Sequence, residues 1–140
     1  MLTSEQLEAI GVQHGKCAEV RYNGHQIVFR RPTRDHCREY RRMRDSPTEK
    51  HDAIEKLAQM CLVAFDGETD ANKARTFYTG VFLEEFPMFA SFPPVMAALG
   101  YLTGMVEEED AADLGKAVRV WSARRPSTQT ESRTGSVTAS

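Results

Sequence analysis

The dipeptide Asn23-Gly24 constrains the fold of this chain more than any other short segment. Asparagine followed by glycine supplies the two positive φ angles of a type I′ turn, which joins two antiparallel strands. The flanking runs, residues 17–22 and 25–30, contain the β-branched and aromatic residues typical of strands. One side of each run is apolar and is formed by Val20, Tyr22, Ile27 and Phe29. The segment therefore predicts a β-hairpin whose apolar side packs on helices.

Most of the remaining chain has the three-and-four spacing of apolar residues that is typical of amphipathic helices. The predicted helices cover residues 34–45, 47–64, 71–86 and about 93–104, with a last helix at 107–122. Thr33 is the expected N-cap of the first, and Ser46-Pro47-Thr48-Glu49 has the cap, proline and glutamate of a strong helix start. We therefore expect an α+β fold that is mainly α, in which an N-terminal β-hairpin is followed by a bundle of four helices.

The length of 140 residues favours one compact unit with tails. Residues 1–15 are expected to be an N-terminal arm with a short, loosely held helix that begins near Thr3 and closes at Gly11. Residues 16–125 are expected to form a single globular domain. Residues 126–140 are predicted to be a disordered polar tail, since they contain a single large apolar residue.

Neither a membrane span nor a disulfide framework is predicted. The longest apolar run, residues 60–65, is far shorter than the roughly 18–20 residues of a span, and the N-terminus has acids where a signal peptide has bases. Cys17, Cys37 and Cys61 are odd in number and form no C-x-x-C pair. We expect reduced cysteines and a cytoplasmic location.

Charge is divided along the chain although the net charge is only -2. Residues 16–50 carry +5, residues 51–115 carry -9 and residues 116–140 carry +4. Seven arginines lie within residues 27–44. The arginines expected on the outer face of helix 34–45 are candidate partner-binding residues, namely Arg34, Arg38, Arg41 and Arg42.

This basic face has three interpretations. It is a solvated or internally paired surface, for which Asp35, Glu39 and the acidic middle of the chain offer carboxylates. It is a site for an acidic protein partner. Or it binds nucleic acid, which the sequence disfavours because Tyr40, the aromatic residue of this helix, belongs to the apolar stripe.

The aromatic stretch at residues 77–92 has two interpretations. Core packing is the default for aromatic residues at helical spacing. The alternative is an exposed apolar patch that covers another protein. Phe86, Phe89 and Phe92 are therefore the second set of candidate partner-binding residues.

No catalytic, metal or cofactor motif is recognised, and the chain is not expected to be an enzyme. The loop at residues 66–77 lacks the glycine and glutamate that an EF-hand needs at its sixth and twelfth positions. His36 and Cys37 are adjacent on a predicted helix and point about 100° apart, so they do not form a thiol–imidazole pair. No histidine pair has H-E-x-x-H spacing.

Three segments together resemble the small tail assembly chaperones of tailed bacteriophages: "VRYNGHQIVFRRPTRDHCREYRRM", "AIEKLAQMCLV" and "FLEEFPMFASFPPVMAALGYLTG". In that family a β-hairpin ends in an R-x-P-[ST]-R-like turn before a basic helix, and a P-x-F…L…L-x-G segment closes the domain. The residues that match are Arg31, Pro32, Thr33 and Arg34 in the turn, and Phe86, Pro87, Phe89, Leu99 and Gly104 in the closing segment. The proline that the family pattern has after Cys61-Leu62-Val63 is absent here.

The resemblance implies a phage tail morphogenesis factor without catalytic activity. Such a chaperone binds the tape measure protein, helps the tail-tube protein to assemble around it, and works in the cytoplasm of the infected host cell. Two alternatives remain: a small nucleic-acid-binding regulator that uses helix 34–45, and a structural virion subunit. Homo-oligomer formation also stays open.

Overall fold

The predicted hairpin is confirmed. Strands β1 (Lys16–Tyr22) and β2 (His25–Arg30) pair antiparallel, with Val20 opposite Ile27 and Ala18 opposite Phe29. Asn23 and Gly24 have φ angles of 52° and 84°, as the turn requires. In the computed structural model, residues 1–107 and 118–122 are described.

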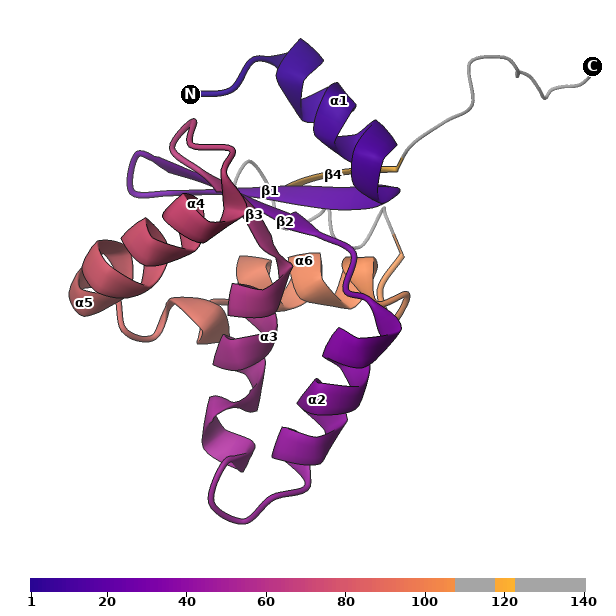
Figure 1. Ribbon diagram of the computed structural model, residues 1–140, viewed down its shortest axis with the longest axis vertical. Helices are drawn as coiled ribbons and strands as arrows, with labels where there is room; N and C mark the ends of the chain where they lie inside the picture. Colours follow the sequence, from indigo (N-terminus) through magenta and orange to yellow (C-terminus); the bar gives the residue numbers. More distant parts are fainter. Residues whose placement is uncertain (108–117, 123–140) are drawn as a thin grey trace, which may run out of the picture.

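Two further strands extend the hairpin into a four-stranded antiparallel sheet (Figure 1). β3 (Leu62–Phe65) pairs with β2, and β4 (Val118–Ser122) pairs with β1, so the order is β3-β2-β1-β4. The predicted mixture of helices and strands is confirmed. The arrangement as a hairpin followed by a bundle of four helices is wrong, because the hairpin is the centre of a sheet.

The two edge strands, β3 and β4, are formed by residues for which the sequence predicted helices. The helix expected at 47–64 ends at Cys61, and Leu62 begins an extended segment with ψ of 128°. The sequence predicts a helix at 107–122, but residues 118–122 form β4. Val118 and Val120 are two positions apart and therefore lie on the same side of this strand. The earlier part of that predicted helix, residues 108–117, and the predicted tail at 126–140 lie outside the described residues.

The helices after the hairpin lie on one side of the sheet, although the first of them packs mainly against the next helix and not against a strand. They are α2 (Arg34–Arg44), α3 (Ala53–Cys61), α4 (Ala71–Phe77), α5 (Leu83–Glu85) and α6 (Pro93–Leu102). A π-helical turn, Tyr78–Phe82, joins α4 to α5, and short 3₁₀ turns occupy Lys50–Asp52 and Phe89–Ser91. In the described part of the chain, no helix has the length and apolar character needed to cross a membrane.

The helix starts show which capping signals operate. Thr33 caps α2 as predicted, because its hydroxyl accepts a hydrogen bond from the His36 N–H at 3.1 Å. The predicted start at Pro47 is wrong, and α3 begins at Ala53. The Ser46 hydroxyl lies 3.2 Å from the Thr48 hydroxyl instead of capping a helix.

Helix α1 (Ser4–His14) covers the opposite face of the sheet (Figure 1). The expected capping box between Thr3 and Gln6 is present, but the helix continues past Gly11 to His14. Leu2 and Leu7 are buried in a second apolar cluster with two residues of the sheet, Val28 and Ala64. Residues 1–15 are therefore a packed layer and not a loosely held arm.

Two buried polar side chains lie between α1 and the sheet. Gln26 is fully buried, and Glu19 is 4% exposed. The Gln26 amide nitrogen donates to the Glu19 carboxylate at 2.6 Å, and its oxygen accepts from the Leu2 N–H at 2.9 Å. The Arg21 guanidinium also donates to Glu19, at 2.9 Å. These bonds satisfy the buried polar groups and attach the N-terminus to the sheet.

Trp121 of β4 contacts α1 directly. Its indole Nε1 donates to the Leu7 carbonyl oxygen at 3.1 Å. A Cβ atom at Gly11 would lie 2.5 Å from the same nitrogen, which is inside any van der Waals contact. Glycine at this position therefore permits the Nε1–Cδ1 edge of the indole ring to approach the helix.

We expect Gly11→Ala to destabilise the protein by about 1 kcal/mol, because overpacking against Trp121 outweighs the helix propensity that alanine adds. Trp121 is the sole tryptophan, so its fluorescence in urea unfolding reports both stability and the altered contact. The matched control is Gly80→Ala. Gly80 lies in a helical turn with no atom within 4 Å of the added Cβ, so a gain of about 0.5–1 kcal/mol is expected. An equal gain for both variants would contradict the packing described here.

Candidate protein-binding surfaces

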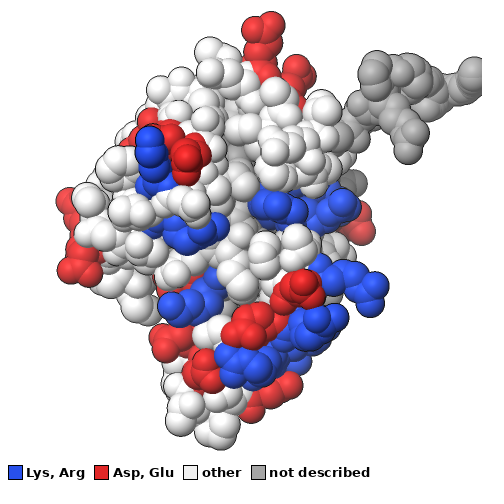
Figure 2. Space-filling model, viewed as in Figure 1, with Lys and Arg blue, Asp and Glu red and all other residues white. Residues whose placement is uncertain are grey.

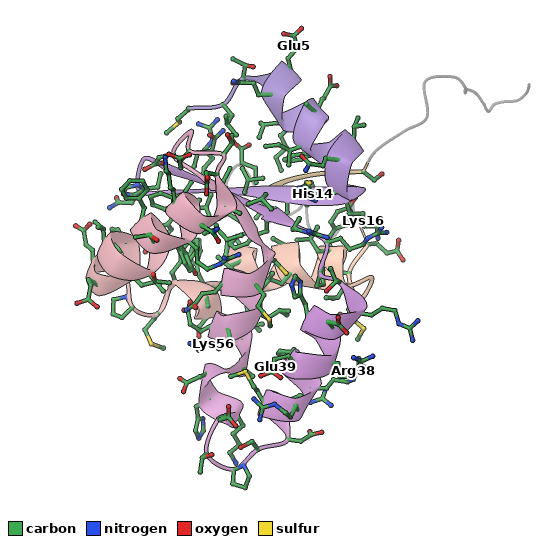
Figure 3. The ribbon with its side chains drawn as sticks, viewed as in Figure 1. Glu5, His14, Lys16, Arg38, Glu39 and Lys56 are labelled. Carbon is green, nitrogen blue, oxygen red and sulfur yellow. The ribbon has the colours of Figure 1, made fainter. Side chains whose placement is uncertain are left out.

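The basic face of α2 is exposed, as its sequence predicted. Arg34, Arg38, Arg41 and Arg42 all have exposed side chains. Two of them are paired within the chain: Arg38 with Asp35 at 2.7 Å, and Arg42 with Glu39 at 2.6 Å and Glu49 at 2.9 Å. Figure 2 shows the resulting mixture of blue and red side chains at the lower end of the molecule. Arg38 and Glu39 are labelled on α2 in Figure 3.

The carboxylates that pair with α2 come from nearby in the sequence. Asp35 and Glu39 precede their arginines by one turn, and Glu49 follows in the connection to α3. Hydrogen bonds from Arg42 lower the pKa of both Glu39 and Glu49. Within the described part of the acidic middle, no carboxylate pairs with these two arginines. Arg34 and Arg41 form no ion pair with any described residue.

The second set of predicted residues converges on Tyr22, at the end of β1. The centroid of the Tyr22 ring lies 5.1 Å from that of Phe86, 5.4 Å from that of Phe89 and 4.9 Å from that of Phe92. The pairs have edge-to-face geometry, which aromatic quadrupoles favour. Phe89 is only 2% exposed, whereas Phe86 and Phe92 are half-buried. Phe89 is thus a core residue, and the other two expose part of their rings.

An open groove lies over these rings, and we call it the aromatic groove. It is lined by Tyr22, Glu85, Phe86, Pro87, Met88, Phe89, Ser91 and Phe92. Met88 is 72% exposed at its edge. Val81, 66% exposed, lies one turn before Glu85, and Phe77, 47% exposed, lies one turn earlier again. An exposed apolar row therefore leads along the helical segment to the groove.

The structure does not combine the two predicted sets into one site. In Figure 1, α2 and the segment that follows α5 lie on opposite sides of α3. Sequence reasoning also missed Tyr22, Val81 and Met88. Val81 was missed because it fits the apolar spacing of the predicted helix 71–86, which indicates an inward position, whereas its side chain points outward.

Two of the three cysteines are buried, and His36 has a structural role. Burial raises the pKa of the Cys17 thiol to about 11 and that of Cys61 to about 12, so both are protonated at neutral pH. His36 Nδ1 accepts a hydrogen bond from the Thr33 N–H at 3.2 Å and completes the cap of α2. Among residues 1–107 and 118–122, no group of three or more His, Cys, Asp or Glu side chains is placed to hold a metal ion.

Comparisons with protein-family models, with curated proteins and with solved structures found no match. The chemistry of the two surfaces is therefore the basis for inferring a function. The aromatic groove offers apolar area with an acidic neighbour, and α2 offers two unpaired guanidinium groups.

We expect Phe89→Ala to cost about 3–5 kcal/mol of unfolding free energy, since a buried aromatic ring is removed from the core. Met88→Ala, at the adjacent position, is expected to change stability by less than about 0.5 kcal/mol, because its side chain is exposed. Urea unfolding of the two variants measures the difference. If both substitutions change the unfolding free energy by a similarly small amount, Phe89 is not a core residue and is again a candidate partner-binding residue.

Proposed function

We propose that this chain is an assembly chaperone of phage tail morphogenesis that binds the tape measure protein through the aromatic groove. The observation that carries the proposal is the exposed apolar row of Phe77, Val81 and Met88 beside the half-buried rings of the groove. Large apolar side chains gathered in this way favour contact with another protein. The resemblance to tail assembly chaperones supplies the identity of the client.

The groove fits an amphipathic helix better than a flat protein surface. Its floor is formed by rings that are held in place by Tyr22 and by the core, so the floor is rigid. Glu84 and Glu85 are exposed at its helical edge. A client helix with one apolar stripe and flanking basic residues would fill the groove and pair with these carboxylates. A long helical protein such as a tape measure protein presents stripes of this kind repeatedly.

Helix α2 is a second and separate surface in this proposal. Arg34 and Arg41 have no carboxylate partner among the described residues and favour an acidic segment of the same client or of the tail-tube protein. Internal pairing of Arg38 and Arg42 leaves fewer charges for a phosphate backbone. A protein partner is therefore preferred to nucleic acid. The work of such a factor would take place in the host cytoplasm, where tails are assembled.

Co-expression with the tape measure protein encoded in the same genome tests the proposal. We expect the wild-type chain to keep the client soluble and to co-purify with it. Val81→Glu combined with Met88→Glu should reduce the co-purified client about tenfold or more, because two carboxylates would enter an apolar contact without partners. Both positions are exposed, so the stability of the free chain should change by less than about 0.5 kcal/mol.

The matched control is Val12→Glu on the outer side of α1, where the side chain is 71% exposed and belongs to the opposite layer. This variant should bind the client as the wild type does. A client that stays insoluble with the wild-type chain, or full binding by the double variant, would reject the proposal. Mass spectrometry of purified particles addresses the structural alternative: a virion subunit remains in the finished particle, whereas a chaperone does not.

A further inference from the structure

A pocket that shares no residue with the aromatic groove has no role in the proposed function. Its walls are formed by α2, β3, the start of α4 and the ends of α1 and β2. Its volume is about 480 Å³. Four side chains that bear or accept positive charge line it: His14, Arg30, His36 and Arg75. We call these residues the basic pocket. They come from four different elements, so the fold alone brings them together.

Each element places its residue for a local reason. Arg30 ends β2 on the same side as Gln26 and Val28, the side that α1 covers. His14 is in the last turn of α1, where Figure 3 shows it close to the sheet. Arg75, on α4, is held by its Nε, which donates to the Gln59 carbonyl oxygen at 2.9 Å.

The positive charge of the pocket is not balanced within the described residues. No Asp or Glu lines the pocket, and neither Arg30 nor Arg75 forms an ion pair with a described carboxylate. Both guanidinium groups are partly buried, where an unpaired charge costs more than at the open surface. Figure 2 shows blue side chains on both sides of the white region in the middle of this face.

The His36 ring is placed to donate a hydrogen bond into the pocket through Nε2. Since His36 Nδ1 accepts from the Thr33 N–H, the neutral ring carries its proton on Nε2. Burial and the charge of Arg30 lower the pKa of His14. Burial and the charges of Arg30 and Arg75 lower the pKa of His36, and the charge of Asp35 raises it to a smaller extent. Burial is the larger cause of both shifts, and the contributions of the arginines show that positive charge lies near both rings.

We propose that the basic pocket binds the phosphate group of a small phosphorylated ligand. Two guanidinium groups and two imidazoles around one opening match a tetrahedral dianion better than a carboxylate, because they offer donors from several directions. The wall also contains apolar side chains, Ile10, Met60, Leu62 and Val63, which suit the organic part of such a ligand. This binding is independent of the client-binding role.

NMR titration of the full chain with inorganic phosphate, adenosine monophosphate and adenosine tests the inference. The ring signals of His14 and His36 should move with either phosphate compound and not with adenosine. Those of His25 and His51, which lie outside the pocket, should not move. Tighter binding of the nucleotide would show that the apolar wall is used, and equal binding would show a site for the free anion. No shift with either phosphate compound, or equal shifts at His51, would reject the inference.

Variants that remove one charge locate the binding. Arg30→Met and Arg75→Met should each weaken phosphate binding about tenfold or more, because a charge-assisted hydrogen bond is lost. Arg34→Met removes the same charge from an exposed position on α2 and should change the affinity less than about twofold. Circular dichroism checks that each variant is folded. If Arg75→Met unfolds the protein because the bond to Gln59 is lost, Arg30→Met alone tests the role of the pocket charge in binding. An equal loss in Arg34→Met would reject a defined pocket and indicate general charge attraction only.

The histidines give the binding a pH dependence with a defined sign. A bound anion raises the pKa of His14 and His36 above that of the free pocket, so binding takes up protons and tightens as pH falls. Sulfate is the suitable probe because its own charge is constant in this range. We expect its affinity to rise from about pH 8 to about pH 6.

Replacement of both histidines with glutamine should abolish this rise. His36→Gln keeps a residue that completes a capping box at the same position of α2, so the helix start is preserved. His51→Gln is the control, since His51 is exposed and lies outside the pocket. An affinity that does not change with pH, or a rise that persists in the double variant, would contradict the role of the two imidazoles.

Discussion

The burial of both faces of the β1–β2 hairpin is the constraint on which the rest of the structure depends. Ala18, Val20, Ile27 and Phe29 face the helices, while Glu19, Gln26 and Val28 face α1. A sheet with polar groups on a covered face needs a cover that supplies hydrogen bonds, and the backbone of Leu2 does so. The first residues of the chain are therefore part of the core, and the position of α1 in turn closes one side of the basic pocket.

The elements that the sequence predicted well are those whose signals are local. Asn23-Gly24 determines the hairpin through its own φ angles, and the Thr33 cap of α2 involves residues three apart. β3 and β4 are short edge strands that become strands by pairing with β2 and β1, and no local pattern of theirs excludes a helix. The helix start predicted at Ser46-Pro47 was wrong for a different reason: the Ser46 hydroxyl bonds to the Thr48 hydroxyl within the turn and does not cap a helix. Local signals therefore predict the backbone where they alone determine it, and they fail where distant pairing or a competing local bond determines it.

The same distinction applies to the candidate sites. Exposure of the α2 arginines followed from the helical period, but their pairing with Glu49 needed the geometry of the connection to α3. Helical periodicity placed Val81 and Phe82 on one apolar face, although Phe82 is buried and Val81 points outward within a π-helical turn. Arg30 and Arg75 are 45 positions apart in the chain, and no motif connects them. Their proximity results from the order in which β2, β3 and α4 follow one another in space.

Strand β4 pairs with β1 although nearly a hundred residues separate them in the chain. During synthesis, β1 leaves the ribosome early and its outer edge has no partner until residues 118–122 emerge. Its N–H and C=O groups on that side are then open to pairing with another strand, which is the usual hazard of an incomplete sheet. Helix α1 and the later helices can cover the faces of the hairpin before this point, but they cannot occupy its edge. The last of the described strands thus completes the first, and correct folding of the sheet waits for it.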